Sequence, residues 1–265
     1  MQGAEPGQLD IIQAKRYSTA LSASSDRIFQ LILENDVDTL KALLRNPNLS
    51  DDHLFALLKR RDLPEEILTL IHQRRANNLS HQLILAIVKN PTTPGTLIRR
   101  LLPTLRMFEL VDLCFIPGVT PDQRLAAERM IIQRLPTTPV GNKITLARRA
   151  TAAVVGELLK EGDSRTFDAC LNSPRLQEAA VFQLLNGTNA TATTISMVAR
   201  HFRWKQRPNL QMAILKNRHT PAIWYTLWLP KLPVTAINQI LSSRRLSAQQ
   251  KALVQLELKR RVTKR

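Results

Sequence analysis

The chain has 265 residues, of which 44% are hydrophobic and 22% are charged, and its 38 Lys and Arg against 21 Asp and Glu give a formal net charge of +17. This composition excludes a globally disordered chain, and no apolar run approaches the roughly 18 residues of a membrane-spanning helix. The first residues have neither the basic nor the apolar region of a secretory signal, so we expect a soluble, cytoplasmic protein of one or two domains.

Residues 1–25 are rich in Gly, Ser and Ala, which predicts a flexible lead-in. Residues 26–150 then contain successive segments with the apolar spacing of amphipathic helices, most of them preceded by a helix-start signal. A Thr-Pro pair recurs at these starts. We expect the Thr hydroxyl to cap the helix whose first residue is the Pro. The pairs begin at Thr93, Thr120, Thr138 and Thr220.

Residues 151–258 repeat this pattern, because a shift of 127 residues aligns the two halves without a gap from about residue 31 to residue 126. Ala86–Asn90, for example, aligns with Ala213–Asn217. Prolines recur at about the interval of units that stack two or three helices, and no segment has the alternation of a strand. The sequence therefore predicts an all-α fold, an α-solenoid of two tandem modules (26–150 and 151–258) with a basic tail over residues 259–265.

Three segments share a pattern in which an apolar residue stands two positions before an Asn-Pro or Ser-Pro pair and the start of the next helix follows soon after. They are Leu43–Ser50, Val88–Pro94 and Leu171–Leu176. These segments resemble the leucine-rich repeat variant and HEAT-like helical repeats of bacterial proteins, and residues 146–185 and 203–232 resemble a bacterial branch of that group. The resemblance implies a superhelical binding scaffold and transfers no catalytic residue. Asn217-Arg218 stands where the pattern has Asn-Pro, so that turn departs from it.

Most of the net positive charge lies near the C-terminus. Residues 201–265 carry 14 basic and 1 acidic side chains, a net +13, whereas the aligned residues 74–138 carry 9 and 4, a net +5. Such a surface attracts polyanions, so we expect the second module to bind an acidic protein surface or a nucleic acid. The candidate binding residues are Arg203, Trp204, Lys205, Arg207, Lys216, Arg218, Lys231, Arg244, Arg245, Lys259, Arg260 and Arg261. Two alternatives stay open, a sequence-nonspecific DNA- or RNA-binding protein and a solvated basic face without a partner.

The three tryptophans lie in the same region. Trp224 and Trp228 replace leucines of the first module at helical spacing, which predicts core positions. Trp204 lies among cations and replaces an Asn, so two interpretations remain, packing between repeats or stacking on a nucleic-acid base.

Signals for catalysis are few. The five histidines have no metal-binding spacing, Cys114 and Cys170 are isolated, and no glycine-rich phosphate-binding motif occurs, so we expect no metal, no cofactor and no enzymatic activity. A remote alternative is a HEAT-like DNA glycosylase, which needs a carboxylate in a basic groove to stabilise the developing cation. Asp112 and Asp168 are the two mid-helix candidates for that carboxylate.

Overall fold

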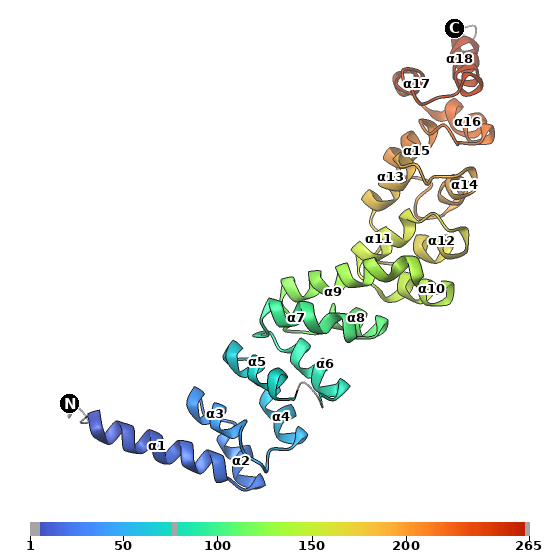
Figure 1. The fold of residues 1–265 in the computed structure, drawn as a ribbon. Coiled ribbons are helices and arrows are strands. Elements are labelled where there is room, and N and C mark those ends of the chain that lie inside the picture. Colours follow the sequence, from blue (N-terminus) through green and yellow to red (C-terminus); the bar gives the residue numbers. More distant parts are fainter. Residues whose placement is uncertain (1–5, 76–78, 263–265) are drawn as a thin grey trace. The chain divides into compact units, whose positions relative to one another are not determined.

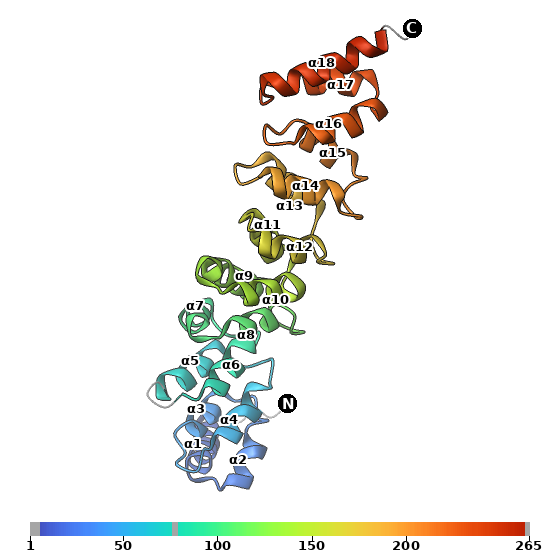
Figure 2. The same ribbon diagram turned by 90° about the vertical axis from the view of Figure 1, so that its right-hand side faces the viewer.

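The structure, a computed structural model, describes residues 6–75 and 79–262, and for residues 6–12 it describes the backbone alone. Helices joined by turns and loops make up these described residues, and no strand occurs among them (Figures 1 and 2). The all-α part of the sequence prediction is confirmed. No helix within residues 6–75 or 79–262 is both long and apolar enough to cross a bilayer.

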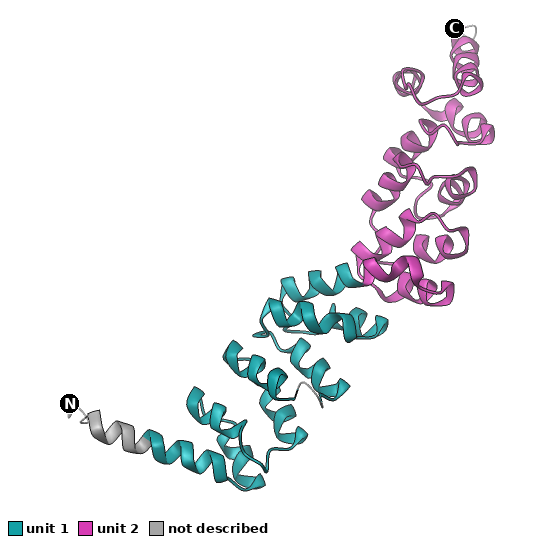
Figure 3. Cartoon of the chain, viewed as in Figure 1, with its two compact units in different colours: residues 1–130 teal, residues 131–265 magenta. Residues whose placement is uncertain are grey.

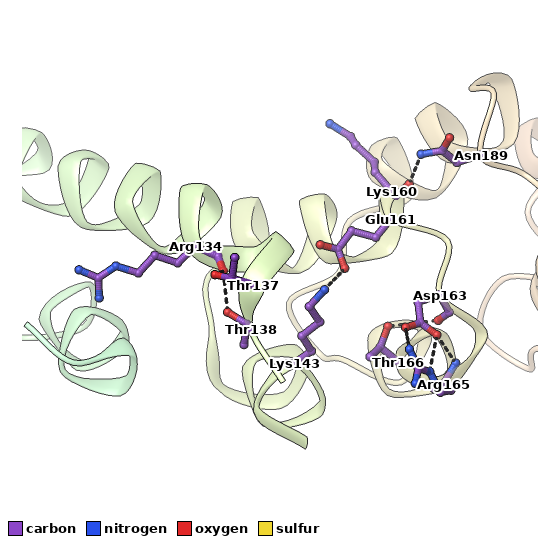
Figure 4. Close-up of polar contacts among 10 residues, drawn as sticks. All are labelled: Arg134, Thr137, Thr138, Lys143, Lys160, Glu161, Asp163, Arg165, Thr166 and Asn189. Carbon is purple, nitrogen blue, oxygen red and sulfur yellow. Dashed lines mark hydrogen bonds and ion pairs between the residues drawn. The ribbon is translucent and has the colours of Figure 1, made fainter. Parts of the chain in front are cut away.

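The chain divides into two compact units, residues 1–130 and 131–265 (Figure 3). This division lies before the boundary between residues 150 and 151 that the sequence repeat predicts. The helix α10 (Val140–Arg149) belongs to the second unit because it packs on the two helices that follow it, α11 and α12. Lys143 of α10 also forms a 2.7 Å ion pair with Glu161 (Figure 4).

The first unit alternates between two layers of helices. Contacts join α1 to α3 and α3 to α5 in one layer, and α2 to α4 and α4 to α6 in the other. The elements are α1 (Pro6–Ser22), α2 (Ser25–Leu31), α3 (Val37–Leu43), α4 (Asp51–Leu58), α5 (Glu65–Arg74), α6 (His81–Lys89), α7 (Gly95–Leu101), η1 (Leu102–Thr104), α8 (Met107–Leu113) and α9 (Pro121–Arg134). The division between the two units lies within α9.

The second unit has the same alternation. Contacts join α11 to α13 and α13 to α15 in an odd layer, and α10 to α12, α12 to α14 and α16 to α18 in an even layer. Besides α10 and a short 3-10 helix before it, η2 (Leu135–Thr137), the elements are α11 (Ala152–Lys160), α12 (Ser164–Leu171), α13 (Glu178–Asn186), α14 (Ala192–Arg200), α15 (Pro208–Leu215), α16 (Ala222–Trp228), η3 (Leu229–Lys231), α17 (Val234–Leu241) and α18 (Ala248–Val262).

The expected lead-in, residues 1–25, contains a helix in the structure. Residues 6–22 form α1, which packs on α3. The buried side chain of Asn46 donates hydrogen bonds to the carbonyl oxygens of Ala20 (2.8 Å) and Ala23 (3.0 Å), and both alanines are buried. Residues 1–5 lie outside the described part. At the other end, the expected basic tail begins inside α18, and residues 263–265 lie outside the described part.

Each unit contains a buried asparagine that fixes a turn to the end of an earlier helix in the same layer, α4 in the first unit and α13 in the second. Asn90 Nδ2 donates to the carbonyl oxygen of Leu58 at 3.0 Å, and Asn217 Nδ2 donates to that of Leu185 at 2.6 Å. In both cases Oδ1 accepts the backbone N–H two residues further on. The turn at Asn217 thus has the geometry of the Asn90 turn, although Arg218 replaces the proline of the pattern.

A glutamine then joins that turn to the start of a later helix in each unit. Gln123 Nε2 donates to the Asn90 carbonyl oxygen at 2.7 Å, and Gln250 Nε2 donates to the Asn217 carbonyl oxygen at 3.3 Å. The Oε1 of each glutamine accepts the backbone N–H three residues earlier, from Thr120 in one unit and from the corresponding serine in the other. The capping boxes that the sequence predicts at these two helix starts are confirmed.

The expectation for the Thr-Pro pairs is wrong at three of the four pairs. The hydroxyl groups of Thr93, Thr138 and Thr220 donate backwards to carbonyl oxygens in the last turn of the preceding helix. The carbonyl oxygens of Ile87 and Ile214 also accept a backbone N–H at the end of their helix, from Asn90 and Asn217. The hydroxyl therefore adds a bond to the end of one helix and does not cap the N–H groups of the next. Only Thr120 accepts an N–H from the helix that follows, that of Gln123.

Candidate functional site

The second unit contains a long stretch without carboxylates. Residues 179–256 include ten Lys and Arg but no Asp or Glu. This stretch covers nearly all of α13 and the chain through most of α18. No negative side chain within this stretch offsets the positive potential of its cations, so its exposed cations attract anions.

Two predicted binding residues are parts of the fold instead. Trp204 is buried and its Nε1 donates to the carbonyl oxygen of Leu171 at 3.1 Å, so its ring has no free face for a nucleic-acid base. Arg203 lies over the Trp204 ring at 4.4 Å from the centroid. Its guanidinium donates to the carbonyl oxygens of Ser173 (2.8 Å) and Leu176 (2.9 Å) in the turn between α12 and α13.

Arg261 is a third predicted site residue with a structural role. Its guanidinium donates to the carbonyl oxygens of Leu229 (2.6 Å) and Leu232 (2.7 Å) at η3, and its Nε pairs with Glu257 at 2.9 Å. Carbonyls at the end of a helix have no intrahelical partner and carry partial negative charge. The cation therefore stabilises the end of η3 and is not available to a partner.

The first unit uses arginine in the same way. Arg60 Nη1 donates to the carbonyl oxygens of Ile32 and Glu34 after α2, both at 2.6 Å, and Arg74 Nη1 donates to that of Leu44 after α3 at 3.3 Å. Some of the basic side chains that make up the net charge of +17 thus bind backbone carbonyl groups of the fold.

Four predicted residues gather along one edge of the second unit, which we name the basic edge: Lys216, Arg218, Arg244 and Arg245. The first two follow α15 and the last two follow α17. Their turns are joined because Gln250, at the start of α18, donates to the carbonyl oxygens of Asn217 (3.3 Å) and Arg218 (3.1 Å).

Three side chains of the basic edge are exposed, and that of Lys216 is half-buried. Arg245 Nη1 donates to Oδ1 of Asn186 at 3.1 Å, which links the edge to the end of α13. Among the described residues, neither Lys216 nor Arg244 has an ion-pair partner. The side chain of Arg218 forms a hydrogen bond only with the ring of the neighbouring His219. This group of cations keeps its charge available to solvent.

The other predicted residues lie elsewhere on the second unit. Lys205 and Arg207 are exposed in the segment before α15, where Arg207 lies 3.7 Å from Glu178. Lys231 is exposed in η3, and Lys259 and Arg260 are exposed on α18. The structure does not bring these residues to the basic edge.

An exposed aromatic ring that was not predicted from the sequence lies in the segment that holds Trp204. Phe202 is 73% exposed, and its ring stacks on that of His201 with centroids 4.7 Å apart. Trp224, by contrast, is buried, and Trp228 packs against the core beside it, as expected. Phe202 could have been suspected from its place among polar and basic neighbours, but nothing in the sequence separates its exposure from that of Trp204.

Groups that could support catalysis are dispersed. Asp112 and Asp168 are exposed and belong to different units. Burial raises the pKa of each thiol, Cys114 and Cys170, to about 12, so neither is a thiolate near neutral pH. Within residues 6–75 and 79–262, no group of three His, Cys, Asp or Glu could hold a metal ion.

Comparisons with known proteins found no protein-family model, no curated protein and no solved structure that matches the chain.

Proposed function

We propose that the chain is a non-enzymatic helical-repeat scaffold whose second unit docks an anionic partner, either an acidic protein surface or a nucleic acid, on the basic edge. The observation that carries this proposal is the grouping of Lys216, Arg218, Arg244 and Arg245 within a stretch of 78 residues, 179–256, that has no carboxylate. Cations grouped without carboxylates favour long-range attraction of a polyanion and release of its counterions.

The proposal includes an α-solenoid built by duplication. It is supported by hydrogen bonds that recur 127 positions apart, such as those of Asn90 and Asn217 and those of Gln123 and Gln250. The alternating helix layers within each unit are those of stacked helical repeats. The resemblance to leucine-rich repeat variant and HEAT-like proteins belongs to the same proposal.

The alternative is a structural role, in which the cations only offset the partial negative charge at the C-terminal ends of helices. Lys216, Arg244 and Arg245 do follow helices. However, a cation that serves a helix end in this protein reaches back to its carbonyls, as Arg261 does, whereas Lys216 and Arg244 make no such bond among the described residues.

The experiment compares two triple variants of the full chain. Lys216→Glu, Arg218→Glu and Arg244→Glu reverse the basic edge without disturbing the bond of Arg245 to Asn186. The matched control, Lys59→Glu, Arg99→Glu and Arg129→Glu, reverses three exposed cations of the first unit and leaves the same net charge.

We expect binding to polyglutamate and to mixed-sequence RNA, measured at low salt, to be lost in the edge variant and largely retained in the control. Equal losses in both would mean that net charge alone attracts polyanions, which would contradict a docking edge. Binding to RNA but not to polyglutamate would favour the alternative, a sequence-nonspecific nucleic-acid-binding protein.

A further inference from the structure

Two depressions flank α16 on the even layer of the second unit. The first has a volume of about 360 Å³ and is lined by the outer side chains of α14, chiefly Thr193, Met197 and Arg200, and by Pro221. The second has a volume of about 130 Å³ and lies between α16 and α18. Pro230, Leu253 and Leu256 are among its apolar lining residues.

Exposed aliphatic side chains also lie on α16, the helix that borders both depressions. Ile223 is 51% exposed and Leu227 is 47% exposed, and their spacing of four residues puts them on one face of α16. Leu256, at the edge of the second depression, is 66% exposed. We name the surface formed by Met197, Ile223, Leu227 and Leu256 the even-layer face.

The base of this face is fixed by buried groups. Trp224 is buried beneath the exposed residues of α16, and its Nε1 donates to Oγ of Ser196 on α14 at 3.2 Å. Its ring packs on that of Trp228 with centroids 5.1 Å apart. The face is therefore preformed, which lowers the entropic cost of binding a partner.

Positive charge borders the apolar surface. Arg200, the last residue of α14, is exposed and has no ion-pair partner among the described residues, and Lys231 is exposed at the end of η3. Glu257, the carboxylate that lines the second depression, is already paired with Arg261. A partner here meets aliphatic anchors and uncompensated cations.

We propose that the even-layer face binds an acidic amphipathic helix of another protein. Three exposed aliphatic residues beside shallow depressions suit a helix that inserts apolar side chains at intervals of three and four residues. The bordering cations suit carboxylates on the flanks of that helix. Aliphatic side chains give no stacking platform for bases, so this surface favours a protein over a nucleic acid. The inference rests on the proposed function only in taking the partner to be anionic.

The test begins with a library of randomised peptides displayed on phage and selected against the full chain. We expect the selected peptides to be rich in Asp and Glu and to carry Leu, Ile or Phe at helical spacing. Ile223→Asp and Leu227→Asp should each weaken the binding of a selected peptide by about tenfold or more, because each replaces an apolar anchor with a charge that also repels the peptide. Arg200→Glu should weaken it as well.

Two variants serve as matched controls. Val234→Asp changes an exposed aliphatic residue of α17, 45% exposed, that lies outside the even-layer face, and Lys59→Glu changes an exposed cation of the first unit. Both should leave peptide binding unchanged. Because Ile223 and Leu227 are exposed, their variants should keep the helical circular dichroism and melting behaviour of the wild type.

The proposal is overturned if no peptide is enriched, if the enriched peptides lack either the acidic or the apolar residues, or if Ile223→Asp and Leu227→Asp bind them as the wild type does. It is also overturned if RNA binding, instead of peptide binding, falls in these two variants. Acidic peptides that depend on the basic edge but not on Ile223 would overturn this inference and leave the proposed function standing. Enrichment without acidic residues would count against the proposed function as well.

Discussion

At the scale of single residues, guanidinium groups hold the turns of this protein together. Arg203 and Arg261 each bind two carbonyl oxygens that follow or end a helix, and Arg60 does so in the first unit. Hydrogen bonds that involve a charged group contribute more than neutral ones, and a buried carbonyl left unpaired is costly. We therefore expect these arginines to contribute to stability.

Replacing Arg261 tests that assignment. We expect Arg261→Ala to lower the free energy of unfolding by about 1–3 kcal/mol, because it removes charge-assisted bonds to Leu229 and Leu232. Arg244→Ala should change it by less than about 0.5 kcal/mol, as is usual for exposed side chains. Urea denaturation measures both. An unchanged midpoint for Arg261→Ala would show that the carbonyl contacts do not stabilise the fold.

Asn217 gives a second test at this scale. Asn217→Ala leaves the carbonyl oxygen of Leu185 and a turn N–H without partners, so we expect a loss of about 1–3 kcal/mol in unfolding free energy. Asn90→Ala should cause at least as large a loss, since it breaks the equivalent bonds in the first unit and two more, to the Arg60 carbonyl oxygen (2.7 Å) and the Thr92 hydroxyl (2.8 Å). The exposed Asn209 of α15 supplies the control, and Asn209→Ala should be nearly neutral. A smaller loss for Asn90→Ala than for Asn217→Ala would argue against equivalent turns.

At the scale of elements, short helices depend on their caps. The α3 helix has 7 residues, and the carboxylate of its N-cap, Asp36, accepts bonds from the backbone N–H (2.9 Å) and the hydroxyl (2.6 Å) of Thr39. The hydroxyl bond is the main cause that holds the pKa of Asp36 below its ordinary value of 3.8. Because the charged form is favoured in the folded state, its contribution is present above pH 3.8 and is lost as pH falls through the lowered pKa.

Asp36→Ala should therefore cost about 1 kcal/mol of stability near neutral pH, a typical value for losing a cap. As pH falls below 3.8, the difference between wild type and variant should shrink. Denaturant titrations of both proteins across this range measure it. A difference that stays constant through acidification would mean that the charge of Asp36 is not part of the cap.

Local sequence patterns specify the helices better than they specify the side-chain contacts. The capping boxes at Gln123 and Gln250 follow from spacing alone, because both partners lie within one helical turn. The roles of Arg203 and Trp204 depend on carbonyls about 30 residues earlier in the chain, which no local pattern identifies. Of the predicted binding residues, those of the basic edge remain exposed or half-buried, while Arg203, Trp204 and Arg261 are engaged in the fold.

At the scale of the whole molecule, the boundary between the units makes a further prediction. Since α10 packs on α11 and α12 and Lys143 pairs with Glu161, a fragment of residues 131–265 should keep the core of the second unit. Residues 151–265 lack α10 and should unfold at a lower denaturant concentration. Circular dichroism with urea compares the two fragments. Equal stability would place the boundary at residue 150 after all.

The most direct test of the account as a whole is the slope of log Kd against log salt concentration for a polyanion, measured with mixed-sequence RNA and with polyglutamate. Each phosphate contact adds about 0.7–0.9 to the slope, so replacing Lys216, Arg218 and Arg244 by Ala, which removes three charges without reversing them, should reduce the slope for RNA by about 2, with a parallel reduction for polyglutamate. Ala replacement of Lys59, Arg99 and Arg129 should leave both slopes nearly unchanged. Identical slopes for the wild type and the Ala variant of the basic edge would contradict an anionic partner docked on the basic edge.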